Sequence, residues 1–352
     1  MIAVGTVRIG NKEIGEGRPC FIIAEAGVNH NGNLEMACGL VDKSIEVGAD
    51  AVKFQTFDPP KLTSTVGTLA KYQAEAGMKY DSQLEMLEKL KLTYDQFRKL
   101  AEYCKKKGQT FLSTPFEYGS LKFLLELGIP AVKLSSSDLT NHPYLAQVAK
   151  AGKPVILSTG MGDMKEIEAA VGTLKGNGAK EIIVMQCTSM YPAPPEALNV
   201  SAIRTLREKL GLPVGFSDHS EGHEADVLAL AYGACVIEKH FTLDKKLPGP
   251  DHTSSLDPAE FKAMVEAVRT AEKMIGDGIK KQVGGEREIV GFSRKSIVFA
   301  KDLPAGHVLS AEDLAIKRPG NGLDPTHLPK VVGRTLKVAV QRDHLLKLSD
   351  LS

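Results

Sequence analysis

The sequence has little cysteine, almost no net charge and no long apolar run, and each shortage excludes a class of protein. Its five cysteines are scattered over 352 residues without a CxxC pair, which indicates free thiols rather than a disulfide framework. The formal net charge is +1, so no overall field attracts the chain to nucleic acid or to a membrane surface. No stretch approaches the roughly 20 apolar residues of a membrane helix, and the first residues lack the pattern of a secretory signal. We therefore expect a cytoplasmic protein.

What the chain does have is a repeated alternation of strand-like and helix-like segments. Eight apolar runs rich in β-branched residues recur, at 21–27, 51–56, 110–116, 131–136, 154–160, 182–188, 213–219 and 235–242. Segments with helical spacing lie between and after them, at 34–47, 94–107, 121–127, 143–150, 165–174, 200–210, 225–231 and 257–276. Eight strand–helix units in a row predict a (β/α)₈ TIM barrel. A doubly wound open sheet is the alternative fold.

Segments outside this alternation suggest the domain boundaries. Residues 4–14 alternate around a Gly-Asn turn and predict a hairpin that precedes the barrel in a first domain, residues 1–276. The long connection 58–83 has little apolar periodicity and is typical of a lid or binding loop. Residues 277–292 are rich in glycine and charge, as in a linker. Short strands expected at 294–300, 315–318 and 335–340 predict a small, mostly β domain over 293–352, which is too small to be secure unless it docks on something.

Two histidines end neighbouring strand-like runs late in the alternation. His219 closes the seventh run, and His240 lies near the end of the eighth. If these runs are adjacent parallel strands, both imidazoles point out of the same end of the barrel. Two neutral imidazoles side by side can hold a divalent metal with positions left open for substrate, and Mn²⁺ suits such a site better than Mg²⁺.

Charged side chains follow other strand ends of the same barrel mouth. Glu25 ends the first run, and Lys53 and Lys133 lie in the second and fourth. Buried lysines without partners are costly, so we expect them to serve a purpose there. Together with Ser136 and Ser158 they predict a pocket for phosphate and carboxylate groups.

Nine motifs carry a resemblance to a known family. They are residues 24–32 (AEAGVNHNG), 52–56 (VKFQT), 113–116 (STPF), 157–161 (LSTGM), 186–192 (QCTSMYP), 215–219 (GFSDH), 238–242 (EKHFT), 249–252 (GPDH) and 316–322 (IKRPGNG). In this order they resemble the sialic acid synthase family, which includes legionaminic and pseudaminic acid synthases. The last motif is similar to the family's C-terminal antifreeze-like (SAF) domain. The resemblance extends over nearly the whole chain.

The resemblance implies a metal-dependent condensation of phosphoenolpyruvate with an open-chain N-acetylhexosamine, which gives a nine-carbon 2-keto acid and phosphate. His219 and His240 then hold Mn²⁺ or Mg²⁺, which polarises the aldehyde oxygen, and Glu25 moves protons. The residues implied for phosphoenolpyruvate are Lys53, Lys133, Ser136, Ser158 and Ser217, with Thr114 and Phe116 closing the pocket. The residues implied for the sugar are Gln55, Ser189, Tyr191 and Asp251.

The resemblance also implies a partner subunit. In the family the small domain is swapped across a homodimer, and the arginine at Arg318 reaches the partner's site to bind the N-acetyl carbonyl. Departures from the family pattern at Ser189, Asp138, Ser135 and Ser137 lie on the sugar side or its support. We expect N-acetylmannosamine as the acceptor, with its 6-phosphate, or a diacetamido-trideoxyhexose leading to legionaminic or pseudaminic acid, as alternatives.

Two further hypotheses belong to other classes of protein. One is a metal-independent Schiff-base aldolase of the same barrel shape, with Lys133 or Lys239 as the nucleophile. The other is a carbohydrate- or ice-binding protein, suggested by the antifreeze-like tail. A binding module has no need of two lysines, a glutamate and two histidines at one mouth, so the residues favour catalysis.

Overall fold

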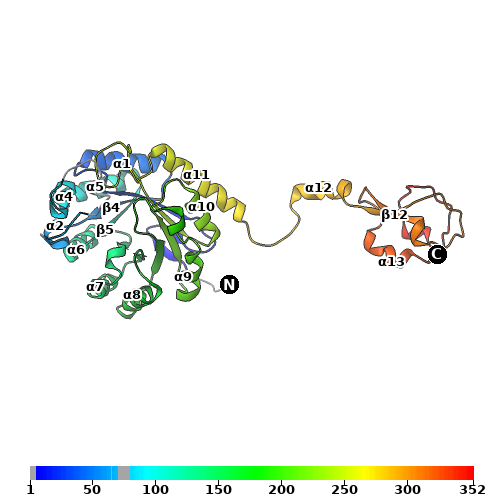
Figure 1. Cartoon of the computed structure of the whole chain (residues 1–352), viewed down its shortest axis with the longest axis horizontal. Coiled ribbons are helices and arrows are strands. Elements are labelled where there is room, and N and C mark those ends of the chain that lie inside the picture. Colours follow the sequence, from blue (N-terminus) through cyan, green and yellow to red (C-terminus); the bar gives the residue numbers. More distant parts are fainter. Residues whose placement is uncertain (1–4, 65, 70–79) are drawn as a thin grey trace. The chain divides into compact units, whose positions relative to one another are not determined.

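The computed structural model of the chain describes residues 5–64, 66–69 and 80–352. The chain divides into two compact units, residues 1–276 and 277–352 (Figure 1). Among the described residues, no helix combines the length and apolar character that a membrane span requires.

The first unit is built on eight parallel strands. In chain order they are β3 (Phe21–Gly27), β4 (Ala51–Thr56), β5 (Thr110–Pro115), β6 (Val132–Leu134), β7 (Val155–Ser158), β8 (Ile182–Cys187), β9 (Val214–Asp218) and β10 (Val236–His240). Their spatial order is β5-β4-β3-β10-β9-β8-β7-β6. The last strand thus pairs with the first, and the two end strands, β5 and β6, contact each other. The predicted barrel is confirmed as a near-closed, TIM-like barrel, and the open-sheet alternative is wrong.

Helices cover the outside of the barrel (Figure 1). They are α1 (Leu34–Glu46), α2 (Pro59–Leu62), α4 (Gln83–Leu90), α5 (Tyr94–Lys107), α6 (Tyr118–Leu127), α7 (His142–Lys150), α8 (Met164–Gly176), α9 (Ala202–Leu210), α10 (Glu224–Ala231) and α11 (Pro258–Ile275). Local chemistry fixes several of their ends. Asp257 caps α11 by accepting hydrogen bonds from the amides of Ala259 and Glu260, and Gly108 ends α5 in the left-handed conformation that glycine adopts without strain.

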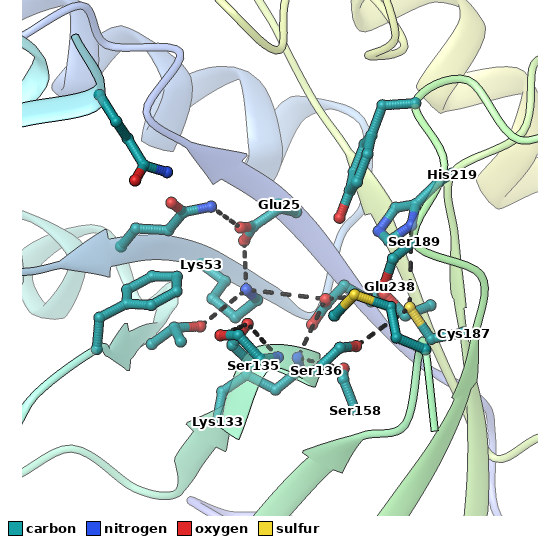
Figure 2. Close-up of a pocket in the computed structure, with 18 of the residues that line it drawn as sticks. Glu25, Lys53, Lys133, Ser135, Ser136, Ser158, Cys187, Ser189, His219 and Glu238 are labelled. Atoms are coloured by element: carbon teal, nitrogen blue, oxygen red, sulfur yellow. Dashed lines mark hydrogen bonds and ion pairs between the residues drawn. The ribbon is translucent and has the colours of Figure 1, made fainter. Parts of the chain in front are cut away.

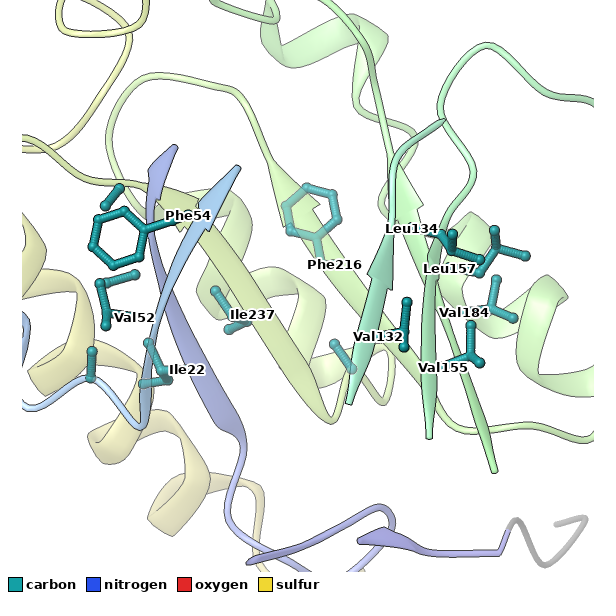
Figure 3. Packing of buried hydrophobic residues seen from close by; sticks show 14 of the residues in the cluster. Ile22, Val52, Phe54, Val132, Leu134, Val155, Leu157, Val184, Phe216 and Ile237 are labelled. Carbon is teal, nitrogen blue, oxygen red and sulfur yellow. The ribbon is translucent and has the colours of Figure 1, made fainter. Parts of the chain in front are cut away.

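Alternation along the strands separates two cores. Outward side chains such as Val52, Phe216 and Ile237 pack against the helices in a large apolar layer (Figure 3). Inward residues at the strand beginnings form a second core with the hairpin β1 (Val7–Ile9) and β2 (Lys12–Ile14), whose Val7, Ile9 and Ile14 are buried there. The predicted hairpin therefore closes the amino-terminal end of the barrel, and the polar residues at the strand ends are left at the opposite mouth.

The long connection between β4 and α5 differs in part from a structureless loop. It contains α2 and α4, and α4 is capped by Ser82, which accepts a hydrogen bond from the Glu85 amide. Residues 65 and 70–79 of the expected lid or binding loop lie outside the described residues.

The second unit has its own small core. Strands β11 (Ser296–Phe299) and β12 (Leu314–Lys317) pair antiparallel, and α13 (Leu328–Val331) follows. The core is Ile297, Phe299, Leu303, Leu309, Leu314, Val331, Leu336, Val340, Leu346 and Leu351.

Two expectations for this part of the chain need correction. The segment 277–292, expected to be a linker, contains helix α12 (Gly284–Ser293), where the Glu286 side chain accepts a hydrogen bond from the Val283 amide in the first turn. The expected strand at 335–340 forms only isolated bridges, because Thr335, Leu336 and Val340 each pair with a different segment. Leu336 and Val340 are buried, but Val338 between them is 50% exposed, and no single neighbour runs alongside the segment.

Asp313 is the polar centre of the second unit, and its replacement by asparagine is expected to loosen that unit. Its carboxylate contacts Lys301 Nζ at 2.9 Å and His307 Nε2 at 2.8 Å, and accepts from the Ser310 amide at 2.7 Å. These contacts, the Lys301 ammonium first, hold the pKa of Asp313 well below its ordinary value of 3.8. We expect Asp313→Asn to lower the free energy of unfolding by about 1–3 kcal/mol, seen as faster hydrogen exchange in β11 and β12.

The contribution of Asp313 to the free energy of unfolding decreases as the pH falls. Because the folded pKa lies below the unfolded one, the stabilisation from Asp313 is complete above the ordinary value of 3.8. It is lost as the pH falls through the folded pKa. The control is Asp343→Asn, which breaks an exposed ion pair with Lys317 and should change exchange little. Equal effects of the two variants would contradict the special role of Asp313.

Candidate active site

Strand register places Glu25 between a lysine and a histidine at the open mouth of the barrel. Glu25 on β3 is the register partner of Lys53 on β4 and of His240 on β10. Lys53 Nζ lies 2.7 Å from Glu25 Oε2, and both side chains are only 3% exposed. Gln55, two residues along β4 and on the same side of the strand, donates to Glu25 Oε1 at 3.1 Å.

Glu238 on β10 joins the two lysines of the site. Its Oε1 lies 3.8 Å from Lys53 Nζ and 3.4 Å from Lys133 Nζ, and it accepts from the Ser217 hydroxyl at 3.1 Å (Figure 2). Glu238 was not among the residues predicted for the site. Its position in the sequence indicates its direction, because it lies two residues before His240 on one strand and so points to the same side as that ring.

Hydroxyl groups line the side of the mouth nearest the lysines. Lys133 donates to Ser158 Oγ at 2.7 Å, and Lys53 donates to Thr114 Oγ1 at 3.1 Å. Ser136 Oγ accepts from the Gly160 amide at 3.0 Å. Two buried ammonium groups with hydroxyls around them form a suitable environment for the oxygens of a phosphate or carboxylate.

The electrostatics give these charged groups different proton affinities. Burial raises the pKa of Glu25, aided by Glu238 and opposed by Lys53. Burial alone would lower the pKa of Lys53, but Glu238 and Glu25 together raise it above its ordinary value. Burial and the neighbouring Lys53 lower the pKa of Lys133 despite Glu238. A carboxyl group with a raised pKa beside a permanently charged lysine is typical of a proton-transfer site.

The two histidines lie together, as their positions on adjacent strands suggest. Their ring centroids are 5.4 Å apart, and β9 and β10 pair in parallel. His219 Nδ1 lies 2.7 Å from the Thr188 carbonyl oxygen, which fixes the tautomer that leaves Nε2 with a free lone pair. Burial lowers the pKa of His240 well below its ordinary value, which keeps that ring neutral.

Metal-binding capacity therefore rests on these two rings. Buried His240 Nδ1 has no hydrogen-bond partner among the described residues, and Asp251 Oδ2 is 3.8 Å away. Within those residues, no group of three or more His, Cys, Asp or Glu side chains forms a complete metal site. Two imidazoles, of which His240 has an unsatisfied buried nitrogen, fit a divalent ion whose other ligands are water or substrate.

A cavity of about 570 Å³ opens at this mouth. Of the residues predicted for the site, its lining contains Glu25, Lys53, Gln55, Thr114, Phe116, Lys133, Ser136, Ser158, Ser189, Tyr191, Ser217 and His219. The described lining does not include His240 and Asp251, whose Nδ1 and Oδ2 lie 3.8 Å apart, or Arg318, which is exposed in the second unit. Ser135 and Ser137, which the motifs placed on the sugar side or its support, also line the cavity, and the lining residues that were not predicted are Thr68, Leu69, Gln83, Met161, Cys187 and Glu238.

The aldolase hypothesis loses one of its two candidate nucleophiles. Lys239 points away from the mouth, is 1% exposed and forms an ion pair with Asp218 on the helix-facing side of β9. It is enclosed there and cannot meet a substrate in the cavity. Lys133 stays within the cavity lining.

Gly27 marks a close approach between the β3 backbone and three side chains at the mouth of the barrel. It has a φ of +52°, and a Cβ there would lie 3.3 Å from Gln55 Nε2 and 3.4 Å from both Asp251 Oδ2 and Glu25 Oε1. We expect Gly27→Ala to cost about 1 kcal/mol of folding free energy through backbone strain, and to displace these three side chains. Thermal unfolding and the KM for the acceptor sugar measure the two effects. Gly128→Ala, at a φ of +81° with open space around it, is the matched control, and it should lower stability without changing that KM.

Comparison with known proteins places this geometry in a family. The NeuB family matches residues 40–280, and the SAF domain matches residues 294–352. The N,N'-diacetyllegionaminic acid synthase of Legionella pneumophila is 44% identical over 94% of this chain and 94% of its own length. The enzyme of the same name from Campylobacter jejuni is 43% identical over 93% of this chain and 98% of its own length.

A solved structure agrees over both sequence and fold. The crystal structure of N-acetylneuraminic acid (sialic acid) synthetase from Leptospira borgpetersenii superposes with a TM-score of 0.73 and 34% identity. The match covers 82% of this chain and 95% of that one. The resemblance stated from the motifs is thereby confirmed. The chain belongs to the NeuB family of nonulosonic acid synthases, which are phosphoenolpyruvate-dependent transferases, and it ends in a SAF domain.

Proposed function

We propose that the protein condenses phosphoenolpyruvate with an open-chain diacetamido-trideoxyhexose to form a legionaminic acid. The observation that carries the acceptor is the higher identity to the two legionaminic acid synthases, 44% and 43%, than to the sialic acid synthetase, 34%. N-acetylmannosamine, the acceptor expected first from the motifs, is therefore the second candidate.

The cavity supports an acceptor without a phosphate group. Among its described lining residues, the lysine and arginine side chains are Lys53 and Lys133. Both already contact Glu238, and both lie in the part of the mouth that suits phosphoenolpyruvate. A sugar 6-phosphate would need a further cation on the acceptor side.

The reaction assigns distinct tasks to these side chains. C3 of phosphoenolpyruvate bonds to the aldehyde carbon, a water oxygen adds at C2, and inorganic phosphate leaves C2 with the bridging oxygen. Lys53 and Lys133, with the hydroxyls of Ser136, Ser158, Ser217 and Thr114, bind the phosphate and carboxylate, and Phe116 closes that side. Glu25 exchanges a proton with the reacting groups: it donates one to the oxygen that becomes the new hydroxyl group, or accepts one from the attacking water. Gln55, Ser189, Tyr191 and Asp251 orient the sugar.

His219 and His240 would hold the divalent metal, Mn²⁺ or Mg²⁺. When bound, the ion supplies Lewis-acid polarisation of the aldehyde oxygen. Thr188 orients the His219 ring for this task through its carbonyl oxygen.

We also propose a domain-swapped homodimer in which Arg318 contributes to the partner's site. Its side chain is exposed in the second unit, where it is free to bind the N-acetyl carbonyl in a partner's site. We expect Arg318→Ala to raise the KM for the acceptor about tenfold, the loss of one charge-assisted hydrogen bond, with the KM for phosphoenolpyruvate unchanged. Arg342→Ala, another exposed arginine of the same unit, is the control. An unchanged acceptor KM, or a monomer by light scattering, would reject this proposal.

The deciding experiment is phosphate release from phosphoenolpyruvate with Mn²⁺, over a panel of diacetamido-trideoxyhexoses, N-acetylmannosamine and its 6-phosphate, with and without chelator. Release that depends on a diacetamido sugar and on the metal is the expected result. Release with N-acetylmannosamine alone would overturn the acceptor. If no sugar gives release, borohydride trapping with pyruvate tests the aldolase, and a label on Lys133 would replace the proposed function.

A further inference from the structure

The helix-facing side of β9 and β10 carries a buried pair of charged side chains, whereas the outward residues of the neighbouring strand β3 are the apolar Ile22, Ala24 and Ala26. Phe216 and Ile237 on the same side pack in the apolar layer of Figure 3, yet the next outward residues are Asp218 and Lys239, which are register partners. Both side chains are at most 1% exposed. Each immediately precedes one of the two histidines in the sequence, Asp218 before His219 and Lys239 before His240.

Hydrogen bonds tie this pair to the backbone on the far side of His219. Lys239 Nζ contacts the Asp218 carboxylate and also donates to the Ser220 carbonyl oxygen at 2.7 Å. Asp218 Oδ1 in turn accepts from the Ser220 amide at 2.8 Å. The residues before and after His219 are thus held by one closed ring of contacts, and the same ring includes the residue next to His240.

The pair is an unusual choice if its task is stability alone. Removing two charges from water is expensive, and apolar replacements of such pairs are often as stable or more so. A third ionisable group, Asp226 of α10, lies 3.9 Å from Lys239 Nζ and is fully buried, and burial together with Asp218 raises its pKa well above the ordinary value. Apolar residues at these positions would continue the surrounding core, but they could not fix the backbone of residue 220.

We propose that Asp218 and Lys239 are positioning residues, an outer clamp that sets the direction of the His219 and His240 rings for metal binding. Apart from the clamp, the two rings contact each other and the Tyr191 ring, whose centroid lies 4.2 Å from that of His219 and 5.8 Å from that of His240. His219 Nδ1 contacts the Thr188 carbonyl and the Cys187 thiol, and His240 Nδ1 has only Asp251 at 3.8 Å. The inference rests on the proposed function in one respect, the assignment of a divalent metal to these two rings.

The affinity of the full-length protein for Mn²⁺ tests the clamp, and this measurement does not depend on catalytic activity. Free Mn²⁺ is titrated against wild type, Asp218→Asn, Lys239→Met and the double variant, and is followed by electron paramagnetic resonance. Asparagine can still accept from the Ser220 amide, and the double variant leaves no uncompensated charge from the pair. We expect Mn²⁺ to bind about 10- to 100-fold more weakly in all three variants, whereas thermal stability in chelator recovers in the double variant.

A matched ion pair at the other end of the barrel provides the control. Asp50 and Arg269 are 2.7 Å apart, and Asp50 accepts from the Ile22 amide before β4 begins. Arg269→Met with Asp50→Asn removes an ion pair in the same way and should leave Mn²⁺ affinity unchanged. Wild-type affinity in the clamp variants, an equal loss in the control, or a wild type that does not bind Mn²⁺ would each overturn the clamp. Failure of the proposed function gives a different result, because wild-type protein would then bind Mn²⁺ but release no phosphate from phosphoenolpyruvate.

Discussion

His219→Ala is expected to release phosphate from phosphoenolpyruvate at least about 10³-fold more slowly than wild type while remaining folded. The ring lines the cavity, and its centroid lies 5.4 Å from that of His240. Lewis-acid polarisation by a bound metal is worth several kcal/mol, and about 1.4 kcal/mol corresponds to tenfold in rate. The measurements are kcat/KM in the presence of Mn²⁺ and the metal content of the purified variant.

Folding of the variant is expected to change less than its activity. The His219 side chain lies at the rim of the cavity rather than in either apolar core. His142→Ala is the control, because its half-buried ring contacts the Thr173 hydroxyl on α8 and is not among the described residues that line the cavity. A His219→Ala enzyme that turns over in metal-free buffer at the wild-type rate would reject the metal assignment. A similar loss in His142→Ala would point to general destabilisation instead.

The periodicity of the chain was sufficient to predict the barrel. Buried strands of a barrel are apolar on both faces, so the eight runs stand out against amphipathic helices. Where the periodicity was short, the prediction was less accurate. The fourth strand is only Val132–Leu134, since Ser136 already begins a 3₁₀ turn with Ser137 and Asp138. The glycine-rich stretch that contains α12 likewise hid a helix, because composition does not reveal a helix that remains mostly exposed.

Within the site, the sequence indicated the residues but not their contacts. Glu25, Lys53 and Lys133 stand out because charges at the ends of buried strands must face something polar. Their link through Glu238 depends on the register between β9, β10 and their neighbours, which one sequence does not contain. The direction of Lys239 was available from the sequence, because it alternates with His240 along one strand, and it contacts Asp226 of α10 instead of lining the cavity.

Lys53→Met should produce the second large effect, with kcat/KM for phosphoenolpyruvate falling about 10²- to 10³-fold. Lys53 is the ion-pair partner of Glu25 at 2.7 Å and lies 3.8 Å from Glu238. Its removal deletes one of the two lysine ammonium groups among the described lining residues, and the carboxylates of Glu25 and Glu238 then repel each other without the cation between them. Breaking a buried ion pair in this way costs about 3–5 kcal/mol, so chemical denaturation should also show a large loss of stability.

A second variant separates the loss of stability from the loss of binding. In Lys53→Met with Glu25→Gln the buried charge is neutralised, and we expect the free energy of unfolding to recover by more than half, whereas activity stays low. Lys245→Met, which breaks an ion pair with Glu260 between partly exposed side chains, should change neither quantity by more than about 1 kcal/mol. If Lys53→Met kept the wild-type kcat/KM for phosphoenolpyruvate, the ammonium group would have no part in binding that substrate. The carboxylate and phosphate would then have to rely on Lys133, whose pKa is lowered by burial, and a rate that falls as the pH approaches that pKa would reveal it.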